Sequence, residues 1–153
     1  MFFSHTHIHK IYGPAGLDMG SLLHGYCLGA IHQAYSNNPG AATKNINCAE
    51  KVWESYKASL IAHGLTSEQI LHQIEIETVG FTLAEVCRTA LEFAGGRKWL
   101  QFDDPSIKSK AKIASLQFVS KCMVQRHTGG IALMFQQLKE SIVFCHPTFQ
   151  PHH

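Results

Sequence analysis

The 153-residue sequence has few charged residues and almost no excess of one sign, because only 16% of its residues are charged and the net charge is +2. Nucleic acids and anionic membrane surfaces are bound by strongly basic proteins, so neither is expected as a partner. No apolar run approaches the ~18 residues that a membrane-spanning helix needs. The first residues also lack the basic and apolar segments of a signal peptide. The sequence therefore predicts a cytoplasmic protein.

Paired cysteines and phosphate-binding loops are also missing. The five cysteines are widely spaced and include no C-x-x-C pair. A disulfide framework or a zinc ribbon would show short paired spacings, so we expect small apolar side chains in a reducing compartment. Neither G-x-x-x-x-G-K-[ST] nor G-x-G-x-x-G occurs. The cysteines are Cys27, Cys48, Cys87, Cys122 and Cys145.

What the sequence does contain is apolar residues spaced every three or four positions, which is typical of amphipathic helices. The fold class is therefore predicted to be all-α, a helical bundle with a short extended segment at the amino terminus. Three parts are expected: 1–10, which is rich in histidine, a helical domain over 11–145, and a tail over 146–153. The expected helices cover about 17–34, 45–61, 67–94, 105–126 and 131–143.

Glycine, proline and aspartate mark the expected ends of these helices. Asp104 before Pro105 is an N-cap followed by proline at the first helical position. Asp103 and Asp104 could also be read as paired carboxylates for metal or acid–base chemistry, but capping needs this residue type at this place. Gly80 predicts a break or kink, and Gly129-Gly130 predicts a break between the last two helices.

The predicted core consists of the larger apolar residues on the inward faces of these helices. Helices that each carry one apolar face bury it by packing on one another. The expected core residues are Leu22, Tyr26, Trp53, Tyr56, Phe81, Val86, Leu91, Phe118 and Val119.

Three alternating histidines near the amino terminus, His5, His7 and His9, form a weak candidate metal site. In an extended strand their imidazoles would project from one face, where they could bind zinc or nickel. The sequence around them resembles the His-x-His strand of amidohydrolase-type metal enzymes, whose barrel is too large for this chain. A histidine-rich terminus without a metal is the favoured interpretation.

Two segments together resemble the methylthioribose kinases of the aminoglycoside-phosphotransferase and choline-kinase group. The segment 11–20, IYGPAGLDMG, is similar to the Y-G-P-x-G-x-D-x-G pattern that follows the metal-binding D-P-E motif of that family. The segment 80–89, GFTLAEVCRT, is similar to its G-F-x-x-x-E/K-M-I-R-R helix. The resemblance covers about 11–125 and implies a kinase-like carboxy-terminal lobe that binds substrate.

The resemblance also implies roles for single residues. Arg88 matches the first arginine of the pair that faces the sugar, whereas Thr89 replaces the second. Gly13, Pro14 and Gly16 would be structural residues of the turn. Asp18 would be structural as well, bracing the start of its helix by accepting hydrogen bonds from free amides. No catalytic residue is assigned.

The parts that perform phosphoryl transfer in that family have no counterpart here. The metal-binding carboxylates would fall on Thr6 and Ile8, and the phosphate loop and the H-G-D catalytic loop would lie before residue 1. The chain is therefore expected to be a truncated lobe that is inactive alone, needing no cofactor by itself; ATP and Mg²⁺ are implied by the resemblance only. The alternative is a helical protein-interaction module. The expected partners are a missing amino-terminal lobe or a second copy.

Overall fold

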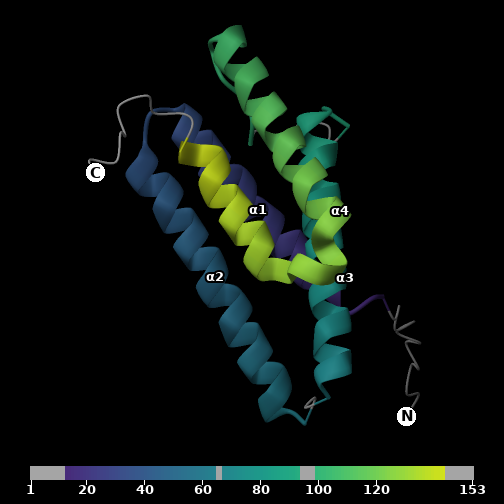
Figure 1. Cartoon of the computed structure of the whole chain (residues 1–153). Helices are drawn as coiled ribbons and strands as arrows, with labels where there is room; N and C mark the ends of the chain where they lie inside the picture. Colours follow the sequence, from purple (N-terminus) through teal and green to yellow (C-terminus); the bar gives the residue numbers. More distant parts are fainter. Residues whose placement is uncertain (1–12, 65–66, 94–98, 144–153) are drawn as a thin grey trace, which may run out of the picture.

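The computed structural model describes residues 13–64, 67–93 and 99–143. Within these ranges the chain folds into helices and contains no strand, so the all-α prediction is confirmed there (Figure 1). The helices are α1 (Gly16–Tyr35), α2 (Pro39–Ala62), α3 (Glu68–Ala90) and α4 (Pro105–Val143). The predicted extended segment and the candidate metal ligands His5, His7 and His9 lie outside the described residues.

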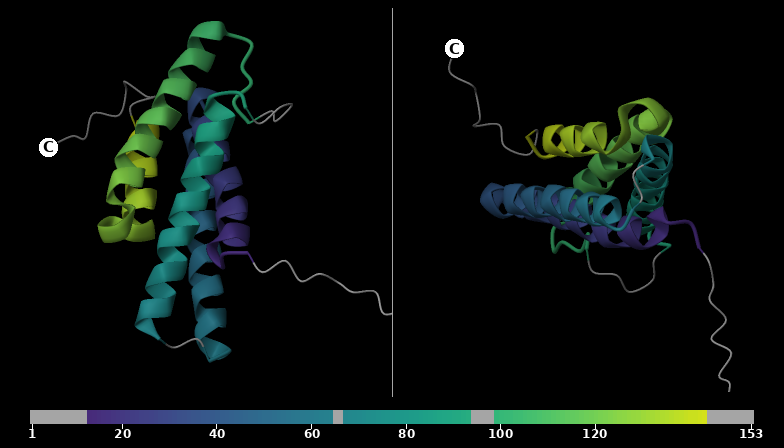
Figure 2. Two further views of the ribbon diagram at one scale, coloured as in Figure 1. Left: turned by 90° about the vertical axis from the view of Figure 1, so that its right-hand side faces the viewer. Right: turned by 90° about the horizontal axis from the view of Figure 1, so that it is seen from below.

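The helices form a four-helix bundle in which α1 is central and contacts the other three. Helix α4 descends along α3, reverses, and returns alongside α2 (Figure 1). Seen from below, α1 and α2 form a layer, and α4 covers only one side of it (Figure 2). In the described part of the chain, no helix is long and apolar enough to cross a membrane.

The reversal of α4 occurs at Gly130, whose φ of 58° and ψ of −152° are not helical. An L-residue avoids this backbone region, so glycine is the residue type that permits the turn. The break predicted from Gly129-Gly130 is therefore confirmed. A break at Gly80, one of the two predicted outcomes, does not occur: α3 continues through this residue, because a helix held by packing on both neighbours tolerates one interior glycine.

Side chains cap two helices at their first turns. The Asp104 carboxylate accepts hydrogen bonds from the amides of Ser106 at 2.7 Å and Ile107 at 3.4 Å, which confirms its capping role. Helix α2 begins at Pro39, earlier than predicted. The Asn38 side chain accepts from the Ala41 amide at 3.4 Å, so residues that the sequence analysis assigned to a loop start the helix instead.

Carboxylates of α3 cap two further helices from outside. Glu77 Oε2 accepts from the amide of Gly16, the first residue of α1, at 3.2 Å. Glu75 Oε1 accepts from the amide of Ile131, where α4 resumes after its reversal, at 3.0 Å. A negative charge at a helix start offsets the unpaired amides and the positive end of the helix dipole. Helix α3 therefore supplies the acceptors for the first turn of α1 and for the first turn of the returning half of α4.

The core lies between the four helices, and all of them contribute buried residues to it. Phe118 and Val86 are fully buried, and Trp53 and Val119 are also buried, as predicted. Tyr26 and Tyr56 pack at the edge of this core, and Phe81 is partly buried. Two core predictions are wrong, because Leu22 is 49% exposed and Leu91 is 48% exposed. Leu22 borders a surface cavity with Trp99, and Leu91 follows the last residue of α3.

Candidate functional site

The turn residues that carry the kinase resemblance lie together at the start of α1. Gly13 and Pro14 are exposed, and the Pro14 carbonyl accepts from the Leu17 amide at 3.0 Å. Gly16 is buried, and a Cβ added there would lie 2.4 Å from the backbone nitrogen of Thr78. The described contacts of this motif are therefore those of helix packing.

Asp18 lies in the first turn of α1, as predicted, and is exposed. The carboxylate that accepts the described hydrogen bond from the first amide of this helix belongs to Glu77. Burial raises the pKa of the Tyr56 hydroxyl, and the nearby Asp18 charge raises it further. That hydroxyl donates to the Ala15 carbonyl at 3.4 Å, so α1 and α2 are joined at this end.

Arg88 lies on the exposed side of α3, near its end. Its guanidinium forms an ion pair with Glu85 at 2.9 Å, one turn earlier in the helix. Thr78, which contacts Gly16, precedes Arg88 by ten residues, or about 15 Å of helix. The structure therefore does not bring Arg88 next to the glycine-rich turn.

The described ranges contain no metal-binding cluster, and their two buried thiols, Cys27 and Cys122, are not nucleophiles. No group of three or more His, Cys, Asp or Glu side chains there could hold a metal ion. Burial raises the pKa of the Cys27 thiol to about 12, with a smaller contribution from Cys122, and burial raises the pKa of Cys122 to about 12 as well. A nucleophilic cysteine needs the thiolate at neutral pH, so these thiols are packing residues.

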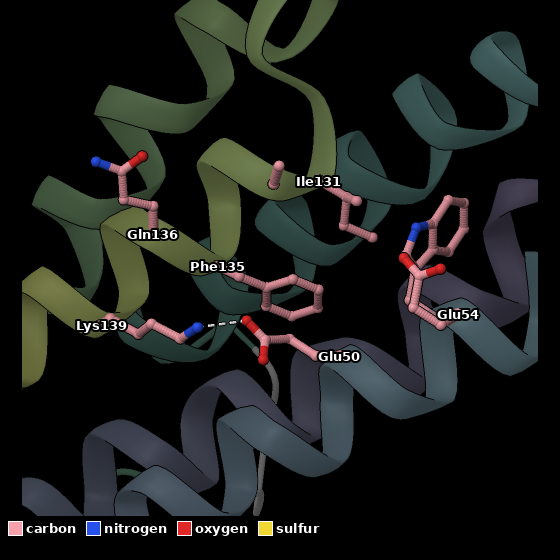
Figure 3. Close-up of a pocket in the computed structure, with 8 residues that line it drawn as sticks. Glu50, Glu54, Ile131, Phe135, Gln136 and Lys139 are labelled. Atoms are coloured by element: carbon pink, nitrogen blue, oxygen red, sulfur yellow. Dashed lines mark hydrogen bonds and ion pairs between the residues drawn. The ribbon is translucent and has the colours of Figure 1, made fainter.

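A groove runs between α2 and the returning half of α4 (Figure 3). Its volume is about 370 Å³, and Glu50 and Lys139 form an ion pair across it. Trp53 is 4% exposed and Phe135 is 5% exposed, so its apolar residues present little surface to a ligand. The second carboxylate, Glu54, pairs with Lys57 at 3.0 Å. The groove is best described as a helix contact bridged by long side chains.

A second cavity, of about 360 Å³, opens on the other side of α1, above Gly25. A Cβ added at Gly25 would lie 3.8 Å from the Trp99 ring, so the indole lies over a position without a side chain. Trp99 is 43% exposed and Leu22 is 49% exposed. Unlike the groove, this cavity is therefore bordered by large apolar side chains that remain accessible. It is lined by Ser21, Leu22, His24, Gly25, Tyr26, Asn45 and Trp99.

The segment that carries Trp99 is held against α1 further along. The Phe102 ring stacks on the His32 imidazole with centroids 4.9 Å apart, and His32 Nε2 lies 3.2 Å from the Gln101 carbonyl oxygen. Leu100 is buried in the core between them. Trp99 therefore belongs to an anchored segment, and a partner would meet it in a defined place.

We call the uncovered side of the α1–α2 layer the outer face. Residues three and four positions apart lie on the same side of a helix, and the outer-face residues of α1 and of α2 both have this spacing. The α1 residues are exposed except for the half-buried Gly25, and the α2 residues are all exposed. The outer face comprises Asp18, Ser21, Leu22 and Gly25 of α1, Lys44, Cys48, Lys51 and Ser55 of α2, and Trp99.

The outer face is not predicted from the sequence, because the spacing of Leu22 is that of a core residue. A signal was present in α2, where Lys44, Cys48, Lys51 and Ser55 follow the spacing i, i+4, i+7 and i+11 and mark a solvent-facing side. Trp99 had no such signal, since it lies in an irregular segment between two helices.

No family model, curated protein or solved structure matches the chain.

Proposed function

We propose that the chain is a helical protein-interaction module that docks through its outer face. The observation that carries the proposal is the pair Leu22 and Trp99, which border one cavity and expose 49% and 43% of their surfaces. Single exposed apolar residues are ordinary on protein surfaces, whereas large ones gathered around a cavity are typical of binding sites. Tryptophan is also among the residues that most often dominate the binding energy of protein interfaces.

The chemistry of the cavity favours a protein partner over a reacting substrate. His24 and Tyr26 are the titratable side chains in its lining, which contains no carboxylate, cysteine, lysine or arginine. Its large exposed side chains, Leu22 and Trp99, are apolar, and they would meet an apolar surface of a partner rather than a polar reacting group. Ser21 and Asn45 supply polar atoms beside the apolar side chains, which suits the apolar centre and polar rim of an interface.

Site-specific photo-crosslinking in cells tests the proposal. A photoreactive amino acid replaces Leu22, and a matched protein carries it at Val124, which is 82% exposed on α4. We expect a covalent adduct with one polypeptide, identified by mass spectrometry, from position 22 and not from position 124. Equal adducts from both positions, or none from position 22, would contradict the proposal.

A kinase-like substrate-binding lobe is the second proposal, and the helical fold and the Arg88 segment support it. The Arg88 side chain is 51% exposed and Glu85 holds it at 2.9 Å, so it could contact an anionic or hydroxylated ligand. Titration calorimetry with methylthioribose tests it: saturable binding that Arg88→Ala abolishes would support this proposal, and no heat at millimolar ligand would contradict it. ATP and Mg²⁺ are expected to give no phosphoryl transfer with this chain alone.

A further inference from the structure

We infer that the occupant of the outer face is a second copy of this chain, packed face to face about a two-fold axis that runs parallel to α1 and α2. The inference rests on the proposed function, because it identifies the partner of the same surface. Two helices that form one layer bury their open side most simply against another such layer, and a two-fold pair uses the same patch on both copies.

The charges of the outer face are complementary to themselves. Asp18 is its negative residue and lies on α1, whereas Lys44 and Lys51 lie on α2. None of the three has an ion-pair partner among the described residues. A two-fold axis parallel to the helices lays α1 of each copy on α2 of the other, so opposite charges meet. An axis across the helices would instead lay lysine against lysine.

The positions of these residues along the helix axes decide which lysine meets Asp18. We call each position a height and measure it from the end of the layer where Ala15 lies beside Tyr56. Helices α1 and α2 run antiparallel, with Ala15 beside Tyr56 at one end and Gly29 beside Asn45 at the other. Asp18 lies three residues above Ala15 and Lys51 lies five residues above Tyr56, which are rises of about 4.5 and 7.5 Å.

A two-fold axis parallel to the helices leaves every height unchanged. Asp18 and Lys51 of the second copy then differ in height by about 3 Å when measured from the Ala15–Tyr56 end and by about 7.5 Å when measured from the Gly29–Asn45 end, a difference that the two side chains together can span. Lys44 lies twelve residues above Tyr56, a rise of about 18 Å, and is therefore too far along the layer to pair with Asp18. Lys51 is the partner, and Lys44 is a matched control on the same stripe.

The centre of the outer face suits close contact between helices. Ser21 and Gly25 on α1 and Cys48 on α2 are small, so a facing helix can approach them. Leu22 and Trp99 lie beside these small residues and are the apolar groups that such a contact would bury. Apolar residues at the centre and charges at the edges are the arrangement that protein interfaces share.

Sedimentation velocity of the purified full chain over a range of concentrations tests the inference. We expect a reversible dimer whose dissociation constant rises about tenfold or more with Asp18→Lys or with Lys51→Asp, since each change replaces attraction by repulsion twice per dimer. Combining both changes in one chain should restore the wild-type constant. Lys44→Asp should change it much less, and added salt should weaken the wild-type dimer.

An engineered disulfide gives a second, independent measurement. Ser21→Cys places a thiol on α1 opposite Cys48 of the second copy, and mild oxidation should then give a covalent dimer on a non-reducing gel. Ser120→Cys, an exposed position on α4, and the wild-type chain are the controls. Equal dimer from Ser21→Cys and Ser120→Cys would overturn the inference.

A wild-type chain that stays monomeric at several hundred micromolar, or a dimer indifferent to both charge reversals, would also overturn it. These failures are distinguishable from failure of the proposed function. If the chain is monomeric and the photoreactive group at position 22 captures a different, identified polypeptide, the interaction module stands and the second copy is wrong. If the chain is monomeric and position 22 captures nothing, both are wrong.

Discussion

The contact between α1 and α3 and the contact between α2 and α4 join helices in opposite ways. Where α1 meets α3, a Cβ added at Gly20 would lie 2.6 Å from Phe81 Cβ and 3.0 Å from the Thr78 carbonyl oxygen. Where α2 meets α4, a groove of about 370 Å³ remains and the Glu50–Lys139 ion pair spans it. The first contact depends on the absence of side chains and the second on their length.

This difference has an energetic consequence. Closely packed helices cannot shift without a clash, so a small change in volume at Gly20 must move a backbone. Across the groove, the partly exposed ion pair contributes little, and the stability comes from buried side chains such as Trp53 beneath it.

The largest effect is expected for Trp53→Ala. Trp53 is 4% exposed and lines the groove, so its removal should lower the free energy of unfolding by roughly 3–5 kcal/mol. Urea denaturation followed by far-ultraviolet circular dichroism measures the change. Trp99→Ala, at a residue that is 43% exposed, is the control and should cost clearly less. Equal losses would show that the α2–α4 contact does not depend on Trp53.

Gly20→Ala should be next in size. The added methyl group overpacks the α1–α3 contact, which costs about 1–3 kcal/mol, and the better helix propensity of alanine returns up to about 1 kcal/mol. At Gly40 nothing lies within 4 Å of an added Cβ, so Gly40→Ala should keep or raise the stability. Thermal unfolding of the two variants side by side checks the prediction, and a Gly20→Ala protein as stable as Gly40→Ala would contradict it.

Removing the ion pair across the groove should have a small effect. Lys139→Met keeps most of the length of the side chain and removes its charge, so the free energy of unfolding should fall by less than about 1 kcal/mol. The loss should shrink further in 1 M salt, because exposed charges are screened there. A loss of several kcal/mol that high salt reduces would mean that the ion pair rather than Trp53 holds α2 to α4.

The smallest perturbation is thiol labelling of the unaltered chain. Burial raises the pKa of Cys27 to about 12, so at neutral pH it reacts only when the bundle opens, whereas Cys48 is exposed. With an opening free energy of about 4 kcal/mol or more, Cys27 should react about a thousandfold more slowly than Cys48. Mass spectrometry of labelled peptides measures both rates. Comparable rates would show that α1 is not held by its contact with α3.

Much of the fold follows from local sequence signals. Apolar spacing gives the helices, and the Asp104 cap and the break at Gly130 are recognisable from residue type alone. Those signals describe one helix at a time. They favour a break or kink at Gly80 because an interior glycine destabilises an isolated helix, whereas packing on the neighbouring helices keeps α3 continuous.

The candidate site was harder to predict because it depends on what is left uncovered. Leu22 has the spacing of a core residue, and only the folded structure shows that it is 49% exposed beside Trp99. Gly16 is predicted as a structural residue of a kinase-like turn, whereas the structure places it in close contact with α3, as it does Gly20. Tertiary contacts of this kind cannot be derived from the periodicity of a single helix.

The hydrogen bonds to the two carboxylates of α3 also report the order in which the helices pack during folding. Glu77 and Gly16 are 61 residues apart in the chain, and Glu75 and Ile131 are 56 apart, so neither hydrogen bond forms until a long stretch of chain has closed. In an isolated helix these first-turn amides would exchange freely with solvent. Protection of the Gly16 and Ile131 amides during refolding therefore times the arrival of α1 and of the returning half of α4 on α3, one reporter for each event.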